Sequence, residues 1–378
     1  MADRILRFGV IGLSRGFVLS RAMFADPRVR LTAAADPRRE AQAAFEAEFG
    51  GRAYADAGAL LADPDVDAVY VASPHGLHAE QAIAAARAGK HVLVEKPMAL
   101  SLEDCRAMRL AAEAAGVILL VGPSHGYDLP IAKTADLIAG GGYGRLRMLT
   151  LMTFTDFMYR PRTAEERQAG AVLSQAAHQV DVAMRLAGAR VARVRAQVQG
   201  WDAARGGAGA WQALLEFENG VSAQLTYSGY GRFDTDALMD WTGELGQLRT
   251  ASDYGAARRR LGEADEADLK RLRSYGAAPA AEFERIGHEH FGFVLASCDG
   301  ADLRPTAHGV EVYGEARETL PLPPPAVPRQ GVVDELWDAI VEGRPPLHDA
   351  AWGEANLAVC LAIVRSSEEG REIALGGT

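Results

Sequence analysis

The amino-acid sequence predicts an α/β protein: a doubly wound parallel sheet, followed by an α+β domain with a large, open, mainly antiparallel sheet. Three observations lead to this fold class. The chain has 378 residues, more than the roughly 250–300 at which a single core tends to split. Short apolar runs alternate with helical patterns in the first third. Beyond residue 123, runs with strand character follow one another. We therefore expect two domains, residues 1–123 and 124–378.

The first domain is predicted from apolar runs separated by amphipathic segments. Candidate helices cover residues 39–49, 78–88 and 102–115. Ser101, with Asp104 three residues later, resembles a capping box in front of the last of them. Strands alternating with helices indicate βαβ units and hence a parallel sheet. The candidate strands cover residues 5–11, 31–35, 68–72, 91–95 and 117–121.

The second domain opens with a helix near 130–139 and a strand at 145–159, whose alternation is typical of a half-exposed antiparallel strand. A helix near 171–187 follows. The proline-rich segment 320–331 can be neither helix nor central strand, so we expect an extended surface connector there. Further candidate strands cover 191–200, 211–218, 221–230, 237–250, 288–297 and 310–320, and the final helices cover 331–342 and 350–368.

Composition and charge exclude several classes of protein. The chain has 48% hydrophobic and 24% charged residues, as ordinary globular proteins do, and a net charge of −10 without a basic block argues against nucleic acid. The three cysteines match no metal or redox spacing, which favours a reducing cytoplasm. A strand pattern begins at once, leaving no room for a signal peptide, and no apolar run could cross a bilayer. We expect a cytoplasmic protein.

The stretch GVIGLSRGF, residues 9–17, follows the first candidate strand, where a dinucleotide fingerprint would read G-x-G-x-x-G. Gly12 fills the first position and Ser14 the second, whereas Gly16 stands one residue early for the third. The Ser14 hydroxyl could donate to a phosphate oxygen. Asp36 closes the second strand, where an acidic residue accepts hydrogen bonds from an adenosine ribose. An ordinary strand–turn–helix is the alternative interpretation.

In the stretch HVLVEKPMAL, a short apolar strand ends at Glu95, Lys96 and Pro97. A solvated charge in a turn is the simple interpretation of this lysine. The alternative is that Lys96 is a catalytic residue at the mouth of a nucleotide-binding sheet. An ammonium group there would stabilise a substrate oxygen as its carbon loses hydride.

Three motifs resemble the glucose–fructose oxidoreductase/inositol dehydrogenase (Gfo/Idh/MocA) family. They are Ser73-Pro74 with His78, the stretch GKHVLVEKPMAL, and SQAAHQVDVAMRLAG at 174–188; the similarity continues through AADP and the late stretch that begins GRPPLHDAAWGE. The resemblance implies an N-terminal Rossmann domain and a C-terminal domain whose open sheet covers the substrate. It also implies a homodimer or homotetramer formed through that sheet. The resemblance further implies that the protein is an NAD(P)-dependent dehydrogenase acting on a CH–OH or CH–CH group.

The resemblance assigns roles to individual residues of the first domain. It also implies a cis bond between Lys96 and Pro97, although only about 5–6% of such bonds are cis in general. Asp36 would repel a 2′-phosphate, so we expect NAD as the cofactor, with NADP used less well. The residues implied for the cofactor are Gly12, Ser14, Arg15 and Asp36 for adenosine and pyrophosphate, Ser73, Pro74, His75 and His78 for the nicotinamide side, and Glu95 and Lys96 for the reacting end.

The resemblance places the proton-accepting histidine at His178. On a helix Ser174, His178, Asp181 and Arg185 share one face, and imidazole titrates near neutrality. Many relatives carry aspartate where this chain has Ser174, so either Asp181 takes over that role or the proton follows a different path. A lone helical histidine can also be purely structural. The HEH stretch at 288–290 has no third ligand, so no metal site is expected.

Several stretches resemble one subgroup, the phthalate 4,5-cis-dihydrodiol dehydrogenases. They are GLSRGF, VGPSHGYDLPI, TDFMYRPR, LSQAAHQVD, LTYSGYGRFD and FGFVLASCDGADLRPTAHGVEVYG. The resemblance implies oxidation of cis-4,5-dihydroxy-4,5-dihydrophthalate to 4,5-dihydroxyphthalate, a small dicarboxylate for which guanidinium groups are suitable partners. The residues expected at this substrate are His125, Lys133, Tyr159, Arg160, Arg162 and Ser174. Two alternatives stay open: a sugar or polyol dehydrogenase of the same family, and a cofactor-binding regulatory protein without activity.

Overall fold

The computed structural model describes residues 4–263, 265–277 and 284–376. The described chain forms two compact units, and each is built from separate stretches of sequence. The first unit takes the chain up to Pro123, the described residues within 271–281, and Pro325–Leu357. The second takes Ser124–Lys270, the described residues of 282–324, and the chain from Ala358. The two uninterrupted domains expected from the sequence stay a prediction.

The first unit contains a six-stranded sheet in the described part of the chain, with strand order β3-β2-β1-β4-β5-β6. All of its strand pairs are parallel, which confirms the predicted doubly wound sheet. The order reverses beside β1, and ligands of such sheets bind at the carboxyl ends of the strands on either side of this point. The strands are β1 (Leu6–Ile11), β2 (Val29–Ala35), β3 (Arg52–Tyr54), β4 (Ala68–Val71), β5 (His91–Val94) and β6 (Leu119–Val121).

Helices of the first unit follow these strands in the chain, and their ends match local sequence signals. The Ser101 hydroxyl accepts a hydrogen bond from Asp104 N at 3.1 Å, which confirms the predicted N-cap. Gly116 ends the same helix with φ of 64°, a left-handed conformation that glycine adopts without strain. The helices are α1 (Arg15–Ser20), α2 (Arg39–Phe49), α3 (Ala57–Leu61), α4 (His78–Arg87), α5 (Leu102–Ala115), α11 (Gln330–Ile340) and the first part of α12 (Ala350–Glu369).

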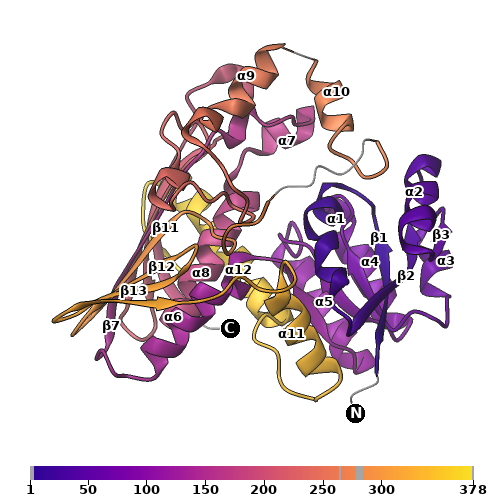
Figure 1. Cartoon of the computed structure of the whole chain (residues 1–378), viewed down its shortest axis with the longest axis horizontal. Coiled ribbons are helices and arrows are strands. Elements are labelled where there is room, and N and C mark those ends of the chain that lie inside the picture. Colours follow the sequence, from indigo (N-terminus) through magenta and orange to yellow (C-terminus); the bar gives the residue numbers. More distant parts are fainter. Residues whose placement is uncertain (1–3, 264, 278–283, 377–378) are drawn as a thin grey trace. The chain divides into compact units, whose positions relative to one another are not determined.

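The second unit contains a nine-stranded sheet among the described residues, in the order β14-β13-β12-β11-β7-β10-β9-β8-β15. Every pair is antiparallel except β7 with β10, so the sheet is mainly antiparallel as predicted. Helices α6 (Leu129–Ala139) and α8 (Ala177–Ala187) pack on it (Figure 1). The strands are β7 (Leu146–Phe154), β8 (Val191–Gln199), β9 (Ala210–Phe217), β10 (Ser222–Ser228), β11 (Phe293–Cys298), β12 (Asp302–Thr306), β13 (Gly309–Tyr313), β14 (Arg317–Pro321) and β15 (Ile373–Ala374).

The strand predicted at 237–250 is wrong. Asp240 and Trp241 have φ of 53° and 54°, in the left-handed region that interrupts an extended strand. Isolated bridges remain in this segment, between Thr242 and Leu248 and between Gln247 and Arg285. The long connection from β10 to β11 also carries α9 (Ala256–Glu263) and α10 (Glu266–Arg271), which the sequence did not predict. The stretch 288–290 lies before β11, not in a strand.

The segment before α8 also differs from the prediction of one helix near 171–187. A π-helical turn, Val172–Ala176, leads into α8, and α7 (Ala164–Ala169) precedes it. Such turns are frequent at functional sites. No helix in the described residues is long and apolar enough to span a membrane.

Candidate active site

The turn after β1 depends on glycine at position 12. Gly12 has φ of +90°, and a Cβ there would lie 2.7 Å from the Cα of Ser73. The chain leaving β1 therefore passes directly against the chain leaving β4. Gly16 makes a second close approach, since a Cβ there would lie 3.0 Å from Oε1 of Glu95. The glycine that is out of register with the fingerprint thus makes room for a carboxylate.

The Ser14 hydroxyl has a different partner from the predicted phosphate. It donates to the main-chain carbonyl of Ala72 and so ties the turn after β1 to the end of β4. Its proton is therefore engaged within the protein. Arg15 is exposed at the start of α1.

Asp36 is buried at the end of β2, where a ribose-binding carboxylate was expected from the sequence. Its Oδ2 accepts a hydrogen bond from Leu13 N at 2.9 Å. Arg38 pairs with both carboxylate oxygens through Nε and one terminal nitrogen, each at 2.9 Å. A carboxylate in this position fits the ribose of a dinucleotide, and the Arg38 partner was not anticipated.

His78 joins the chain segments that follow β4 and β5. Its side chain is fully buried, with Nδ1 3.0 Å from the Pro97 carbonyl and Nε2 3.0 Å from the Ser73 carbonyl. Ser73 in turn donates its hydroxyl to Gln81 at 2.6 Å. Pro74 and His75 are exposed in the turn between Ser73 and α4. This geometry gives His78 a role in holding the strand ends together.

Lys96 follows β5, and its peptide bond to Pro97 is cis, as predicted. The neighbouring Glu95 accepts hydrogen bonds from the Tyr70 hydroxyl and from Lys96 N, the latter at 3.2 Å. Burial and the Glu95 carboxylate raise the pKa of Tyr70 well above its usual value, so this phenol stays a donor. Glu95 thus fixes the main chain at Lys96, whose own side chain is half-buried.

In the second unit, His178 on α8 is held among aromatic and polar groups. Its Nδ1 lies 3.1 Å from the hydroxyl of Ser124. Its ring centroid lies 4.8 Å from that of His125 and 4.7 Å from that of Phe291. The side chain is 4% exposed. Ser124 was not predicted, because a serine in a loop carries no signal of its own.

Asp181 lies one turn after His178 on α8. Its carboxylate accepts a hydrogen bond from Gly126 N at 2.6 Å, and His125 Nδ1 lies 2.6 Å from the Asp128 carboxylate. Asp181 therefore fixes the loop that carries Ser124 and His125 against the helix that carries His178. This contact favours a positioning role for Asp181, and its predicted role beside His178 stays a prediction.

Glu244 lies beside this histidine pair and was not predicted from the sequence. Its carboxylate is 3.9 Å from Nε2 of His125 and 3.5 Å from a terminal nitrogen of Arg160. Burial opposes its ionisation, but the neighbouring His125 and the Arg160 charge outweigh burial and hold the pKa of Glu244 well below its usual value. An ionised carboxylate, a guanidinium and two imidazoles therefore meet in one place.

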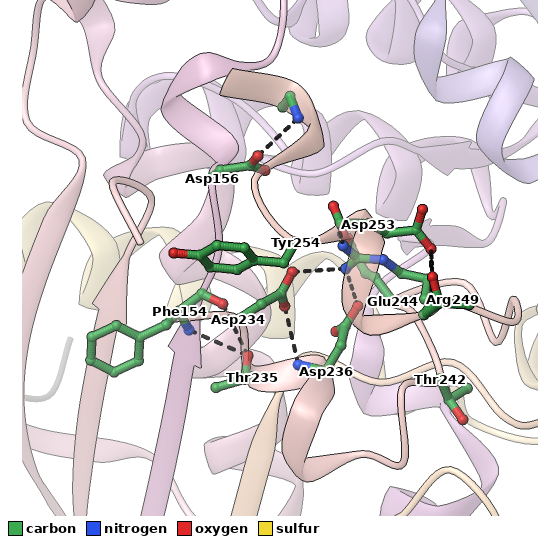
Figure 2. A network of polar contacts seen from close by, with 12 residues as sticks. Phe154, Asp156, Asp234, Thr235, Asp236, Thr242, Glu244, Arg249, Asp253 and Tyr254 are labelled. Atoms are coloured by element: carbon green, nitrogen blue, oxygen red, sulfur yellow. Dashed lines mark hydrogen bonds and ion pairs between the residues drawn. The ribbon is translucent and has the colours of Figure 1, made fainter. Parts of the chain in front are cut away.

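A polar network fixes the loop that carries Glu244 (Figure 2). Arg249 pairs with Asp236 and, at 2.9 Å, with Asp234. It also donates to the Asp253 carbonyl at 3.3 Å. Thr235 binds both main-chain groups of Phe154 at the end of β7. These contacts hold the loop together through Arg249 and attach it to β7 through Thr235.

Two residues predicted to bind substrate have structural partners instead. Arg162 is buried, and its guanidinium donates to the carbonyls of Glu166 and Gly170. The Tyr159 hydroxyl donates to Asp202 at 2.7 Å, and Arg258 stacks on the Tyr159 ring at 3.5 Å. These contacts occupy both side chains within the loops, so the geometry does not favour them as substrate ligands.

The other predicted substrate residues are placed as follows. The Ser174 hydroxyl donates to the Ala171 carbonyl at 3.2 Å within the π-helical turn. Lys133 is half-buried on α6. His125 and Arg160 lie in the cluster around Glu244. Of this predicted set, the structure brings these last two residues together with His178.

The two histidines of the HEH stretch hydrogen-bond to main-chain groups. His290 has Nε2 2.8 Å from the Thr242 carbonyl, and its Nδ1 accepts from Gly292 N at 3.0 Å. His288 Nε2 lies 3.1 Å from the Leu322 carbonyl. Among the residues that the structure describes, no group of three or more His, Cys, Asp and Glu could hold a metal ion.

A parallel dinucleotide-type sheet with an acidic residue at the end of β2, joined to an open mixed sheet, defines an NAD-dependent oxidoreductase. The model of the oxidoreductase family with an NAD-binding Rossmann fold matches residues 6–123. The model of the GFO/IDH/MocA C-terminal domain matches residues 131–249. The chain belongs to the Gfo/Idh/MocA family.

Three relatives indicate where in the family the chain falls. A 1-carboxy-3-chloro-3,4-dihydroxycyclohexa-1,5-diene dehydrogenase of Comamonas testosteroni is 42% identical, over 96% of this chain and 95% of its own. The myo-inositol 2-dehydrogenase of Thermotoga maritima is 32% identical, over 50% of this chain and 57% of its own. A crystal structure of a dehydrogenase from Bordetella bronchiseptica RB50 superimposes with a TM-score of 0.93 and 36% identity, over 98% of this chain and 100% of its own.

Proposed function

We propose that this protein oxidises a cis-dihydrodiol that carries a carboxylate, producing a catechol. The observation that carries the proposal is the cluster of Arg160, Glu244, His125 and His178, in which Glu244 and His125 link a guanidinium to the candidate base. A carboxylate leaving water needs such a fixed positive donor. The Comamonas relative, named for a carboxylated dihydroxycyclohexadiene, supports this substrate class.

The contacts of Arg160 and Arg162 bear on how many carboxylates the substrate carries. Arg160 has about a third of its side chain exposed (34%), whereas Arg162 donates to two main-chain carbonyls. Of the two, Arg160 is not committed to main-chain carbonyls, and the N–H groups that do not face Glu244 suit one carboxylate. The phthalate diol expected from the sequence, with two carboxylates, remains a candidate, and a direct comparison of substrates decides between them.

In the proposed reaction the ring carbon that bears a hydroxyl loses hydride, and the hydroxyl loses its proton. Bound NAD supplies the hydride acceptor. His178 takes the proton, and Lys96 stabilises the negative charge that develops on the oxygen. The resulting hydroxyenone becomes a catechol by moving one ring proton to oxygen, so recovery of aromaticity favours this direction.

Replacing Arg160 with methionine is expected to raise KM for a carboxylated dihydrodiol strongly, by roughly tenfold or more, because the substrate loses a charge-assisted hydrogen bond. KM for benzene cis-dihydrodiol should barely change. Steady-state NADH formation measures both values. Arg162→Met is the matched control: it should lower thermal stability and affect the two substrates alike.

A panel with NAD tests the proposed function itself. It contains the phthalate diol, a monocarboxylated cis-dihydrodiol, benzene cis-dihydrodiol, myo-inositol and glucose. Turnover of the monocarboxylated diol above the others supports the proposal, and the phthalate diol in first place would restore the two-carboxylate substrate. Turnover of inositol or glucose alone would establish the polyol alternative. No NADH with any of them would support the non-catalytic alternative.

We also propose that the protein forms a homodimer or homotetramer through the sheet of the second unit. Met148 on β7 and Leu214 on β9 are 49% and 56% exposed. They lie on one face, since their partners on β10 are Ser222 and Gln224, two residues apart. Substitution Leu214→Glu should shift the mass measured by light scattering to that of a smaller species. An unchanged mass would argue against this face.

The location proposed from the sequence is the cytoplasm. Cys105, Cys298 and Cys360 form no disulfide, and disulfides are rare where thiols are kept reduced. This arrangement supports a reducing compartment.

A further inference from the structure

The carboxylate of Asp36 already has four donors around it. Leu13 N and one terminal nitrogen of Arg38 bind Oδ2, and Arg38 N and Nε bind Oδ1, all at 2.9 Å. A carboxylate offers about four lone-pair sites. The side chain is also buried, with 6% of it exposed. Ribose hydroxyls therefore have no vacant acceptor at Asp36 while Arg38 stays in this position.

Further contacts hold the Arg38 guanidinium in this position. One terminal nitrogen donates to the Leu13 carbonyl at 2.7 Å. The other donates to the Tyr275 carbonyl at 3.3 Å. Arg38 thus bridges β2, the turn after β1 and a segment that comes from much later in the chain.

The Tyr275 carbonyl is itself fixed on the first unit. The Tyr275 ring packs edge-on against Phe17 with centroids 5.1 Å apart. Its hydroxyl donates to Glu48 on α2 at 2.7 Å. Gly276 has φ of +79°, and a Cβ there would lie 3.0 Å from the Glu40 carbonyl. The segment is therefore packed closely against α1 and α2, and it presents its carbonyl to Arg38.

We propose that Arg38 competes with the adenosine ribose for Asp36 and sets the choice between NAD and NADP. Ribose binds Asp36 only after the guanidinium has moved away, and 33% exposure of the Arg38 side chain leaves it a path to solvent. A guanidinium that remains near the ribose is a suitable partner for a 2′-phosphate. The chain therefore prefers NAD because of Asp36 but also accepts NADP because of Arg38.

The test is an equilibrium titration of the purified protein with NADH and NADPH, followed by nucleotide fluorescence. Arg38→Gln should tighten NADH binding by roughly three- to tenfold, because Asp36 no longer has a competing partner. It should weaken NADPH binding by roughly tenfold, because the positive charge is lost. The ratio of the NADPH dissociation constant to the NADH dissociation constant therefore rises.

Two further variants separate charge from geometry. Arg38→Lys keeps the charge but lacks the planar fork that binds both carboxylate oxygens, so NADH binding should tighten while NADPH binding is largely retained. Arg39→Gln is the matched control, since Arg39 is the next residue, exposed and of equal charge. It should leave both dissociation constants close to the wild-type values.

The proposal is overturned if Arg38→Gln leaves both dissociation constants within about twofold of wild type, or if it weakens NADH binding. The second result would make Arg38 a ligand of NAD itself. The proposal rests on the NAD-binding domain of the family and not on the substrate. Because the titrations contain no alcohol, they distinguish its failure from a failure of the proposed reaction.

Discussion

Substitution Lys96→Met is expected to lower kcat by roughly 10²–10⁴, the usual contribution of a positioned acid or base. Methionine keeps the length of the side chain but removes the ammonium that would stabilise the developing oxyanion. Glu95 fixes the main chain at this position through Lys96 N and Tyr70, so the variant should keep its backbone. NADH binding, measured by fluorescence, should survive.

A second lysine provides the control for this measurement. Lys90 precedes β5 and donates from Nζ to the carbonyls of Asp63 and Val66 at 2.9 and 2.8 Å. Lys90→Met should therefore lower the free energy of unfolding and leave kcat of the folded enzyme unchanged. Near-native turnover of Lys96→Met would return Lys96 to the simpler interpretation of a charge in a turn.

Substitution His178→Ala should lower kcat by a similar factor, roughly 10²–10⁴, because the proton of the hydroxyl loses its acceptor. The imidazole is already oriented by Ser124 at 3.1 Å and by the rings of His125 and Phe291. The pH profile of kcat/KM should also lose the limb that reports the base. Stopped-flow mixing under single-turnover conditions would show the loss in the hydride-transfer step.

The buried His348 separates a catalytic from a structural effect. Its Nδ1 lies 2.8 Å from Glu335, and it is 2% exposed. His348→Ala should cost stability without changing the shape of the pH profile. If His178→Ala kept both kcat and the profile of the wild type, another group would have to be the base.

The sheet of the first unit was predictable because its signals are local. Each of β1, β2, β4, β5 and β6 is an apolar run, and buried parallel strands read in this way. β3 was missed because it has three residues, Arg52–Tyr54, and none of them is fully buried. A strand this short shows no apolar run from which it could be predicted.

Pairing in the second sheet could not be predicted from the strands themselves. The alternation along β7 shows that one face is buried, and it is equally compatible with a parallel neighbour. β7 pairs parallel with β10 because the chain crosses to β8 and returns through β9 before reaching it. Strand direction here depends on the path of the chain and not on local composition.

Candidate residues were found where they follow a recognisable strand, as Asp36 and Lys96 do, or lie on a predicted helix, as His178 does. Glu244 was missed because it lies in an irregular loop, in a stretch interpreted as strand. Its position depends on Arg249 pairing with Asp234 and Asp236. Arg38 was missed as a partner of Asp36, since a sequence does not show that a guanidinium binds the carboxylate two residues before it.

The edge strand of the first sheet, β6, is covered by residues that are synthesised much later in the chain. Val121 N in β6 donates to the His348 carbonyl at 2.9 Å, and Leu120 bridges Asp349. Gly353 in α12 packs so closely on this edge that a Cβ would lie 2.5 Å from Val121 Cγ2. A nascent chain has all six strands long before residue 348 leaves the ribosome. Until then β6 is an open edge, the kind of surface on which unfinished chains aggregate.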